Sequence, residues 1–385
     1  MRLARAEVFV HRVPIEQPVR TSFGTMHDRP SVLLRLEDAE GNAGWGEVWC
    51  NYPSVGAEHR ARLLLSTILP LLSGCGDVEE PEAVWSGLTA RLHVLAIQTG
   101  EAGPIAQCLA GVECALQDLA ARKAGVPLWR SLSQDGSPRV AVYASGINPS
   151  GAPQVAAEAA ARGFAGCKIK IGFDAALDRE NLVQARTLLG DGFPLMADTN
   201  QGWSPDEALA FAGTCDEVGL EWLEEPLRHD APDADWRRLA EAMEIPLAAG
   251  ENFSSRMDFE LLPERRSLKV LQPDIGKWGG IANAMAVARL AASGGRTFCP
   301  HWLGSGVGLL ASLHLKAAAG PADGYVEVDF NENRLREEIV RPVFETLDDG
   351  MVEMPDTPGI GEVEDVVRRS SGDCVFSQTL DLDRP

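Results

Sequence analysis

Gly166-Cys-Lys-Ile-Lys-Ile171 is a short apolar stretch interrupted by two lysines, and this alternation decides the fold. Residues two apart in a β-strand share a face, so Lys168 and Lys170 lie together and the cysteine and isoleucines face the other way. The apolar face suits a strand covered by helices, so the lysines point into the interior of a closed sheet. Two neighbouring ammonium groups lower each other's pKa, which makes one usable as a base near neutral pH.

The stretch is one of eight short apolar segments that alternate with alanine-rich segments of helical periodicity. Strands that alternate with helices form parallel sheets, and eight such repeats predict a closed TIM-like (β/α) barrel, although its last helix is not evident. The predicted strands are 140–144, 166–171, 194–197, 220–223, 246–249, 268–271, 296–299 and 325–328, and helices between them include 153–161, 205–214 and 281–292.

The residues before the barrel have a different pattern, with strands first and helices afterwards. We therefore expect an N-terminal α+β capping domain over 1–125 and a barrel domain over 126–350. The tail, 351–385, contains no further βα unit and is expected to pack back on the first domain. The strands predicted in the capping domain are 3–10, 31–36 and 44–48, followed by helices at 57–72, 82–92 and 105–124.

Composition excludes several classes of function. The chain of 385 residues is 45 % hydrophobic and carries a net charge of −21, so a large core is expected, and binding of nucleic acids or anionic membranes is not. No apolar run is long enough to span a membrane, and the N-terminus lacks the pattern of a signal peptide. The eight cysteines form no CxxC pair, which predicts reduced thiols and a cytoplasmic protein.

Acidic residues follow three consecutive predicted strands. Asp198, Glu224 and Glu251 each come at the carboxyl end of a strand, which is where active sites of such barrels lie. Three converging carboxylates repel one another unless a cation neutralises them. A set of oxygen ligands suits Mg2+ better than zinc, so we expect one Mg2+ per subunit. Capping or loop roles remain the alternative for any one of the three.

The next strands end in a carboxylate and an imidazole. Asp274 follows the sixth strand and His301 the seventh, and an Asp beside a His fixes the tautomer of the ring and raises its basicity. Lys170 and His301 then approach one ligand from different sides of the barrel. Such a pair can move protons on one carbon or on two adjacent carbons. On the eighth strand, Glu327 in its protonated form could donate a hydrogen bond to a substrate carboxylate.

These motifs resemble those of the enolase superfamily, mandelate racemase subgroup, over nearly the whole chain. In the related muconate-lactonizing enzymes and dipeptide epimerases a lysine stands at the position of Asp274, so the mandelate racemase type is preferred. The motifs that carry the resemblance are Lys168-Ile-Lys170, Asp198-Thr-Asn200-Gln-Gly-Trp203, Glu224-Glu-Pro226, Gly250-Glu-Asn252, Pro273-Asp-Ile-Gly-Lys277-Trp-Gly-Gly280 and Pro300-His301.

The resemblance implies a role for each position. Lys170 and the His301–Asp274 dyad would be the bases on the two faces of the substrate, and Lys168 would contact its carboxylate. The remaining implied roles are Mg2+ ligation by Asp198, Glu224 and Glu251, electrophilic assistance by Glu327, and secondary or substrate contacts by Asn200 and Lys277. A separate role for Asp329 stays open.

In this family, loops of the capping domain that cover the barrel select the substrate. The matching segments here are 20–29 and 50–53, and Gly24 is a candidate hinge. Arg20 or Arg29 could meet an anionic or hydroxylated end of the substrate, whereas Phe23 and Met26 would favour an apolar one. Tyr52 is the candidate from the second segment.

The expected activity is Mg-dependent removal of the proton α to a carboxylate, followed by dehydration of a sugar acid or other hydroxy acid to a 2-keto acid. Racemisation or epimerisation of a 2-hydroxy acid or related carboxylate uses the same residues and is the alternative. A barrel that binds a small acid without catalysis is the alternative from another class. By the resemblance, the chain is expected to form a homo-oligomer, from dimer to octamer.

Overall fold

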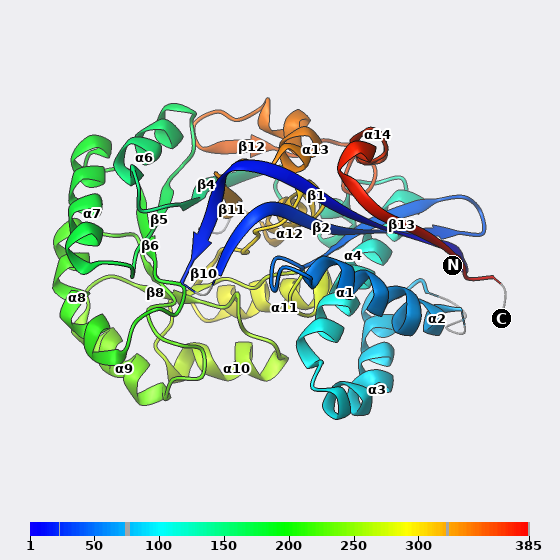
Figure 1. Ribbon diagram of the computed structural model, residues 1–385, viewed down its shortest axis with the longest axis horizontal. Helices are drawn as coiled ribbons and strands as arrows, with labels where there is room; N and C mark the ends of the chain where they lie inside the picture. The colour runs from blue at the N-terminus through cyan, green and yellow to red at the C-terminus, as the bar shows by residue number, and fades with distance from the viewer. Residues whose placement is uncertain (23, 74–77, 321–322, 384–385) are drawn as a thin grey trace.

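Parallel strands form the wall of a barrel in the C-terminal part of the chain, as the alternating pattern predicted (Figure 1). The computed structural model describes residues 1–22, 24–73, 78–320 and 323–383. In this part of the chain the strand order is β10-β9-β8-β7-β6-β5-β4-β11. The backbone N–H of Glu327 donates to the carbonyl of Pro300 at 3.4 Å and closes the ring. The strands are β4 (Arg139–Ile147), β5 (Cys167–Lys170), β6 (Leu195–Asp198), β7 (Leu223–Glu224), β8 (Leu247–Ala249), β9 (Val270–Leu271), β10 (Thr297–Phe298) and β11 (Val326–Asp329).

Helices cover the outside of the barrel, including the last one, which the sequence pattern left unplaced. That helix, α13 (Arg334–Phe344), begins at Asn333, whose side chain accepts the N–H of Arg336. It buries Leu335, Ile339 and Val343, one apolar stripe at helical spacing. The other barrel helices are α6 (Ala152–Ala161), α7 (Ala175–Leu189), α8 (Pro205–Val218), α9 (Asp233–Ala242), α10 (Arg256–Arg265), α11 (Gly280–Ser293) and α12 (Gly306–Ala319).

The N-terminal α+β domain is built on an antiparallel sheet with the order β13-β1-β2-β3. The prediction of a barrel with such a domain in front of it is confirmed. Its first strand continues well beyond 3–10, because β1 and β2 pair as far as Thr21 with Gly24, and this long hairpin reaches over the barrel (Figure 1). The elements are β1 (Leu3–Thr21), β2 (Gly24–Asp38), β3 (Ala43–Val48), α1 (Gly56–Leu63), the π-helix η1 (Leu64–Ile68), α2 (Leu69–Leu72), α3 (Pro81–Thr99), α4 (Ala102–Lys123) and α5 (Leu128–Leu132).

The tail contacts both parts of the molecule. Strand β12 (Met351–Glu353) pairs with the barrel strand β4, whereas β13 (Cys374–Asp381) pairs with β1 of the N-terminal sheet. Between them lie α14 (Glu364–Arg369) and the 3-10 helix η2 (Ser370–Asp373). The cysteines within the described residues are free thiols, and Cys75 lies outside those residues. None of the described helices is both long and apolar enough to cross a membrane.

Two carboxylates from the N-terminal domain cap helices of the barrel. Glu47 on β3 accepts the N–H and hydroxyl of Ser305, each at 2.6 Å, and the N–H of Gly308 at 2.9 Å, at the start of α12. Glu113 on α4 accepts the N–H groups of Ile281 at 2.6 Å and Ala282 at 3.1 Å, at the start of α11. Helix N-termini carry unpaired N–H groups and a partial positive charge, so these bonds join the two parts of the chain. Burial raises the pKa of each carboxyl to about 7.

This burial gives a pH-dependent test. The folded-state pKa of Glu113 is raised from 4.5 to about 7, so its contribution to stability is present below pH 4.5 and is lost as the pH rises through 7. We compare the free energy of unfolding of the native chain with that of Glu113→Gln at each pH. As the pH rises from 4.5 through 7, we expect the native value to decrease relative to the variant by on the order of 3 kcal/mol. Urea unfolding at a series of pH values measures it, with the exposed Glu345→Gln as control. A difference that stays constant or rises would contradict the assignment.

Candidate active site

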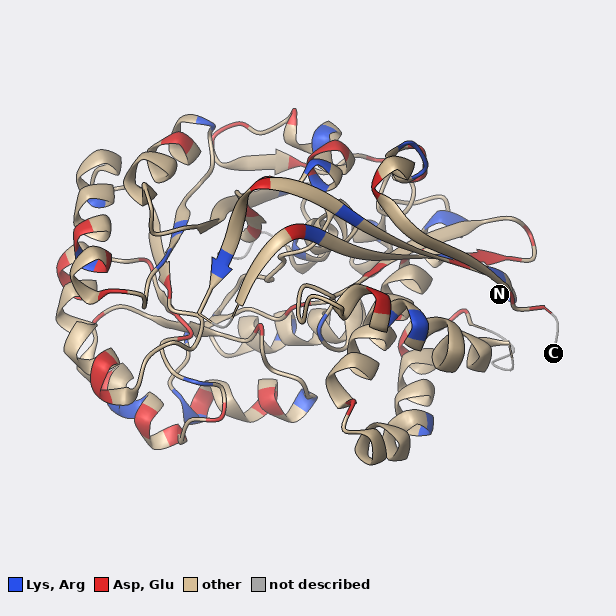
Figure 2. Cartoon of the chain, viewed as in Figure 1, with Lys and Arg blue, Asp and Glu red and all other residues tan. Residues whose placement is uncertain are grey.

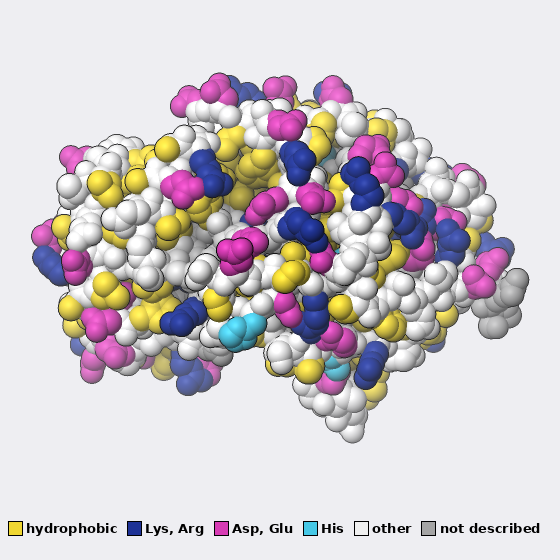
Figure 3. Space-filling view, turned by 45° about the horizontal axis from the view of Figure 1, so that its top comes forward, with side chains coloured by type: hydrophobic (Ala, Val, Ile, Leu, Met, Phe, Trp, Pro, Cys, Tyr) yellow, Lys and Arg dark blue, Asp and Glu magenta, His cyan; other side chains and the backbone are white. Residues whose placement is uncertain are grey.

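The carboxyl ends of the barrel strands and parts of the capping domain enclose a small cavity of about 30 Å3. Figure 2 shows acidic and basic positions together on the barrel strands, and in Figure 3 side chains of both signs gather where the capping sheet meets the barrel. The cavity is too small for a sugar acid, so side chains or the hairpin must move for one to enter. It is lined by Thr21, Trp49, Asn51, Tyr52, Ser145, Gly146, Lys170, Asp198, Asn200, Glu251, Lys277, His301, Leu303 and Glu327.

The three predicted metal ligands come from adjacent strand ends. Asp198 and Glu224 are paired neighbours on β6 and β7, and Glu251 follows β8. All three are buried. Burial and repulsion from Glu251 raise the pKa of Asp198 against the effect of Lys168, and burial together with Asp198 raises that of Glu224 to about 7. These pKa shifts show that the negative charges of the three carboxylates act on one another.

Protein cations and amides contact these carboxylates. Glu224 accepts from Lys168 Nζ at 2.5 Å and from the amide of Gln272. Glu251 lies 2.7 Å from His301 Nε2 and accepts from Lys277 Nζ at 3.2 Å. In the described part of the chain, no group of three or more His, Cys, Asp or Glu side chains is arranged to hold a metal ion. The donor set of three carboxylates suits Mg2+, but the side chains point to protein partners.

The two lysines of β5 differ in their surroundings. Lys168 contacts Glu224 and lies 3.1 Å from Glu327, and these carboxylates outweigh its burial and raise its pKa well above the usual value. It is not among the residues that line the cavity, and its contact with the substrate carboxylate stays a prediction. Lys170 lines the cavity and donates to the carbonyl of Arg20 at 3.4 Å.

Burial is the main reason that the pKa of Lys170 is lowered, and repulsion from Lys168 is a smaller cause. The expected repulsion between the two ammonium groups thus contributes at Lys170, whereas at Lys168 two carboxylates raise the pKa instead. Lys170 is the lysine that loses its proton more easily, and it faces the cavity. This combination fits a general base.

His301 is held on both sides of its ring. Its Nδ1 lies 2.7 Å from Asp274 Oδ2, and the other oxygen of Asp274 accepts the backbone N–H of Gly276 at 2.7 Å. Glu251 and Glu327, on the Nε2 side, outweigh burial and raise the pKa of His301 well above 6.5. The Asp–His pairing expected from adjacent strands is thus present in the geometry, and Nε2 faces the cavity.

Glu327 accepts a hydrogen bond from Ser145 Oγ on β4. Lys168 and His301 outweigh its burial and lower its pKa. These two cations favour the ionised carboxyl, whereas donation of a hydrogen bond to a substrate carboxylate would need the protonated form. Its second oxygen, Oε2, is buried and has no hydrogen-bond partner among the described residues.

Asp329, whose role the sequence left open, forms a buried ion cluster outside the cavity. It lies 2.6 Å from Arg29 Nη2 and 2.9 Å from Arg336 Nη1. Arg29 is 2 % exposed and does not line the cavity, so its suggested contact with substrate is replaced by this pairing. The cluster joins the long hairpin of β1 and β2, called the lid hairpin below, to β11 and α13.

The other predicted substrate contacts divide into two groups. Asn200 and Lys277 line the cavity, and so does Tyr52, whose hydroxyl lies 3.3 Å from Thr21 Oγ1. Arg20 is exposed and Met26 is buried, and neither lines the cavity. Phe23 lies outside the described residues.

Sequence reasoning missed several residues that line the cavity. Ser145 comes from β4, and the rule of strand ends would have found it. Asn51 lies in the quoted segment 50–53, and its side chain donates to the carbonyl of Leu303 at 2.7 Å, across from the capping domain to the barrel. The ammonium of Lys277 lies over the ring of Trp49, with Nζ 5.2 Å from the ring centroid. Thr21, Gly146 and Leu303 gave no signal of their own.

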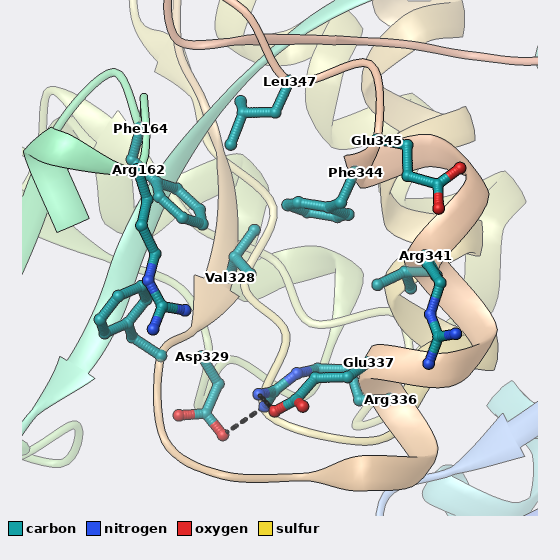
Figure 4. Close-up of a pocket in the computed structure, with 12 residues that line it drawn as sticks. Arg162, Phe164, Val328, Asp329, Arg336, Glu337, Arg341, Phe344, Glu345 and Leu347 are labelled. Atoms are coloured by element: carbon teal, nitrogen blue, oxygen red, sulfur yellow. Dashed lines mark hydrogen bonds and ion pairs between the residues drawn. The ribbon is translucent and has the colours of Figure 1, made fainter. Parts of the chain in front are cut away.

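A larger cavity of about 460 Å3 opens on the outer side of β11, between α13 and the end of α6 (Figure 4). Its wall includes the apolar side chains Val328, Phe164 and Phe344. Asp329 and Arg336 at its edge neutralise each other. Since the candidate bases all face the inside of the barrel, this cavity is separate from the active site.

Comparisons with known proteins cover both parts of the chain. Residues 5–132 match the model "Mandelate racemase / muconate lactonizing enzyme, N-terminal domain", and residues 152–365 match "Enolase C-terminal domain-like". A solved mandelate racemase/muconate lactonizing enzyme from Bordetella bronchiseptica is 46 % identical with a TM-score of 0.90, covering 97 % of this chain and 99 % of that one. A racemase from Streptomyces coelicolor, solved with bound magnesium, is 27 % identical with a TM-score of 0.83, covering 97 % and 100 %.

Two curated relatives with named reactions are 28 % and 30 % identical to this chain. A 3,6-anhydro-alpha-L-galactonate cycloisomerase from Streptomyces coelicolor is 30 % identical over 95 % of this chain and 98 % of that protein. An arabinonate dehydratase from Saccharolobus solfataricus is 28 % identical over 87 % of this chain and 88 % of that protein. The reactions of similar proteins thus include dehydration, cycloisomerisation and racemisation.

The ion cluster around Asp329 is open to a stability test. Asp329→Ala leaves two buried guanidinium groups without their carboxylate, so we expect the free energy of unfolding to fall by about 3–5 kcal/mol. Glu345, an exposed acid directly after the same helix, is the control, and Glu345→Ala should change stability by at most about 0.5 kcal/mol. Guanidinium unfolding measures both. Equal effects of the two variants would show that the cluster does not hold the hairpin and helix together.

Proposed function

The chain belongs to the mandelate racemase/muconate lactonizing enzyme family of the enolase superfamily, and from this premise we propose that it removes the proton α to the carboxylate of a hydroxy acid. One observation carries the proposal. Lys170 and His301, which come from different walls of the barrel, line the same cavity beside Asp198 and Glu251. The membership predicted from the motifs is confirmed, and it makes the chain an enzyme of this superfamily.

We propose that Asp198, Glu224 and Glu251 hold one Mg2+. Their all-oxygen donor set supports this, as does the magnesium bound in the racemase from Streptomyces coelicolor. When bound, Mg2+ supplies positive charge that stabilises the anion formed as a carboxylic acid loses its α-proton. Within the described residues, Lys168, His301 and Lys277 provide the positive charge around the carboxylates.

The chain's own residues supply the proton transfers. Lys170, with its lowered pKa, takes the α-proton on one face of the substrate. On the other face Asp274 holds the His301 ring, so that Nε2 points at the substrate and can give or take a proton. Trp49, Asn51 and Tyr52 form the side of the cavity that belongs to the capping domain and exclude water.

For a substrate with a β-hydroxyl group, the outcome is dehydration. Lys170 or His301 takes the α-proton, and the electron pair left on carbon forms the α–β double bond. The β-hydroxyl departs with a proton from His301 as water, and the resulting enol becomes a 2-keto acid. This reaction, on a sugar acid or similar hydroxy acid, is the preferred one, and the relative that is an arabinonate dehydratase supports it.

Racemisation or epimerisation is the second candidate. Lys170 and His301 both line the cavity, so one could remove the α-proton and the other return a proton to the opposite face. A racemase is among the similar structures. The two reactions differ only in whether the substrate loses water.

Metal binding can be measured without knowing the substrate. We expect calorimetric titration with Mg2+ to give one site per chain. Loss of a residue that only hydrogen-bonds to a metal ligand weakens metal binding roughly 10-fold to 100-fold. Loss of a ligand itself should weaken it more, and we expect this for Asp198→Asn, Glu224→Gln and Glu251→Gln. Asp230→Asn, an exposed acid on the surface, should leave binding unchanged. Wild-type affinity in all three site variants would remove the proposed metal site.

Proton transfer can be followed with a panel of sugar acids and hydroxy acids in D2O. We expect Mg-dependent deuterium uptake at the α-carbon together with a 2-keto product, and Lys170→Ala or His301→Asn should lower turnover about 10²-fold to 10⁴-fold. Uptake without a keto product would favour racemisation. If both variants turn over an active substrate at the native rate, the cavity is not the site of the chemistry.

A further inference from the structure

Helix α3 presents an apolar stripe to solvent. Ala83, Gly87, Ala90, Val94 and Ile97 follow one another at alternate spacings of four and three residues, which places them on one face. All five are exposed, and Val94 and Ile97 are 67 % and 63 % exposed. The same helix is already anchored on its opposite side, so this stripe is not needed for packing within the chain.

The anchoring side consists of other residues. Pro81, Leu88 and Leu92 are buried, and Trp85 packs edge-on against Trp278 with ring centroids 5.9 Å apart. Helix α3 thus has apolar residues on its buried side and along one exposed stripe, with exposed polar residues such as Glu82 and Arg91 between them. Figure 1 shows α3 at the lower edge of the molecule, with its outer side turned away from the other elements.

Gly87 in the middle of the stripe is the second observation. Its backbone is helical, and a Cβ added there would meet nothing within 4 Å. Glycine in an exposed helix interior costs about 1 kcal/mol relative to alanine, and nothing within the described chain requires it. A glycine there does allow the backbone of another helix to approach closely.

Charge selects the occupant of this face. A groove of about 520 Å3 runs along α3 beside Gly87, with Glu79 and Glu80 at one end and Arg91 at the other. Under a two-fold axis through the middle of such a groove, the basic end of each copy meets the acidic end of the other. A surface with this property is complementary to itself, as the interface of a symmetric dimer must be.

We propose that α3 is the interface between two copies of this chain, packed antiparallel with the axis near Gly87. In this arrangement Arg91 of each copy faces Glu80 of the other. Ala90 of each copy lies opposite the partner's Val84 in the groove, and Gly87 lets the two helices approach. The proposal is independent of the reaction that the barrel performs.

Sedimentation velocity of the full chain over a range of concentrations tests this interface. We expect the native chain to self-associate. Gly87→Arg fills the groove without a clash inside one copy, so it should weaken association while the thermal midpoint of the single chain stays equal or rises. Arg91→Glu and Glu80→Arg should each weaken association about 10-fold or more, as close charge pairs at interfaces do.

The charge swap is the decisive arm. The double variant Glu80→Arg with Arg91→Glu keeps opposite charges facing each other, so it should regain most of the association that each single variant loses. Leu188→Arg, at an exposed apolar position on α7, is the control and should have no effect. If the native chain forms more than a dimer, the α3 variants should reduce it to a smaller assembly. A native chain that remains monomeric, or an assembly unchanged in Gly87→Arg and Arg91→Glu, would overturn the proposal.

Discussion

Mutual neutralisation of buried charges is the constraint on which the rest of this structure depends. The barrel mouth buries carboxylates at the ends of β6, β7, β8, β9 and β11. A buried carboxylate is tolerated only where a cation or several hydrogen bonds compensate it. The cations compensate particular carboxylates: Lys168 pairs with Glu224 and Glu327, and His301 pairs with Glu251. This pairing also separates the roles of similar groups, because Lys168 is held in its charged form while Lys170, less closely paired, has its pKa lowered.

The same principle fixes the capping domain over the barrel. Glu47 and Glu113 are buried acids whose partners are the N-termini of α12 and α11, and the pair of Arg29 with Asp329 joins the hairpin to β11. These polar contacts have strict geometry, unlike apolar packing. They hold in place the domain that contributes Thr21 and Tyr52 to the cavity.

Much of the fold and site could be predicted because buried faces of strands and helices require apolar residues at regular spacings in the sequence. Strand β5 was evident from the alternation around Lys168, and the functional positions from their place at strand ends. Pairing between distant side chains leaves no such pattern. The sequence could not tell that Arg29 meets Asp329, that Glu327 is held ionised, or that Met26 turns into the core, since each depends on a neighbour from another element.

The length of the lid hairpin was also hidden. Strand β1 was predicted to end at Val10. In the structure the strand continues through an irregularity between Pro14 and Val19 and pairs with β2 to its tip. Residues 15–18 have no partner on β2, and this bulge interrupts the ladder before it resumes at Val19, so the sequence pattern ends before the strand does.

The most direct test of the central claim is anomalous diffraction from crystals of the protein soaked in Mn2+, a substitute for Mg2+ with the same preference for oxygen ligands. The account predicts one strong peak within bonding distance of Asp198, Glu224 and Glu251, between Lys170 and His301. A peak elsewhere, or no peak while Glu224 and Glu251 keep their contacts with Lys168 and His301, would contradict it.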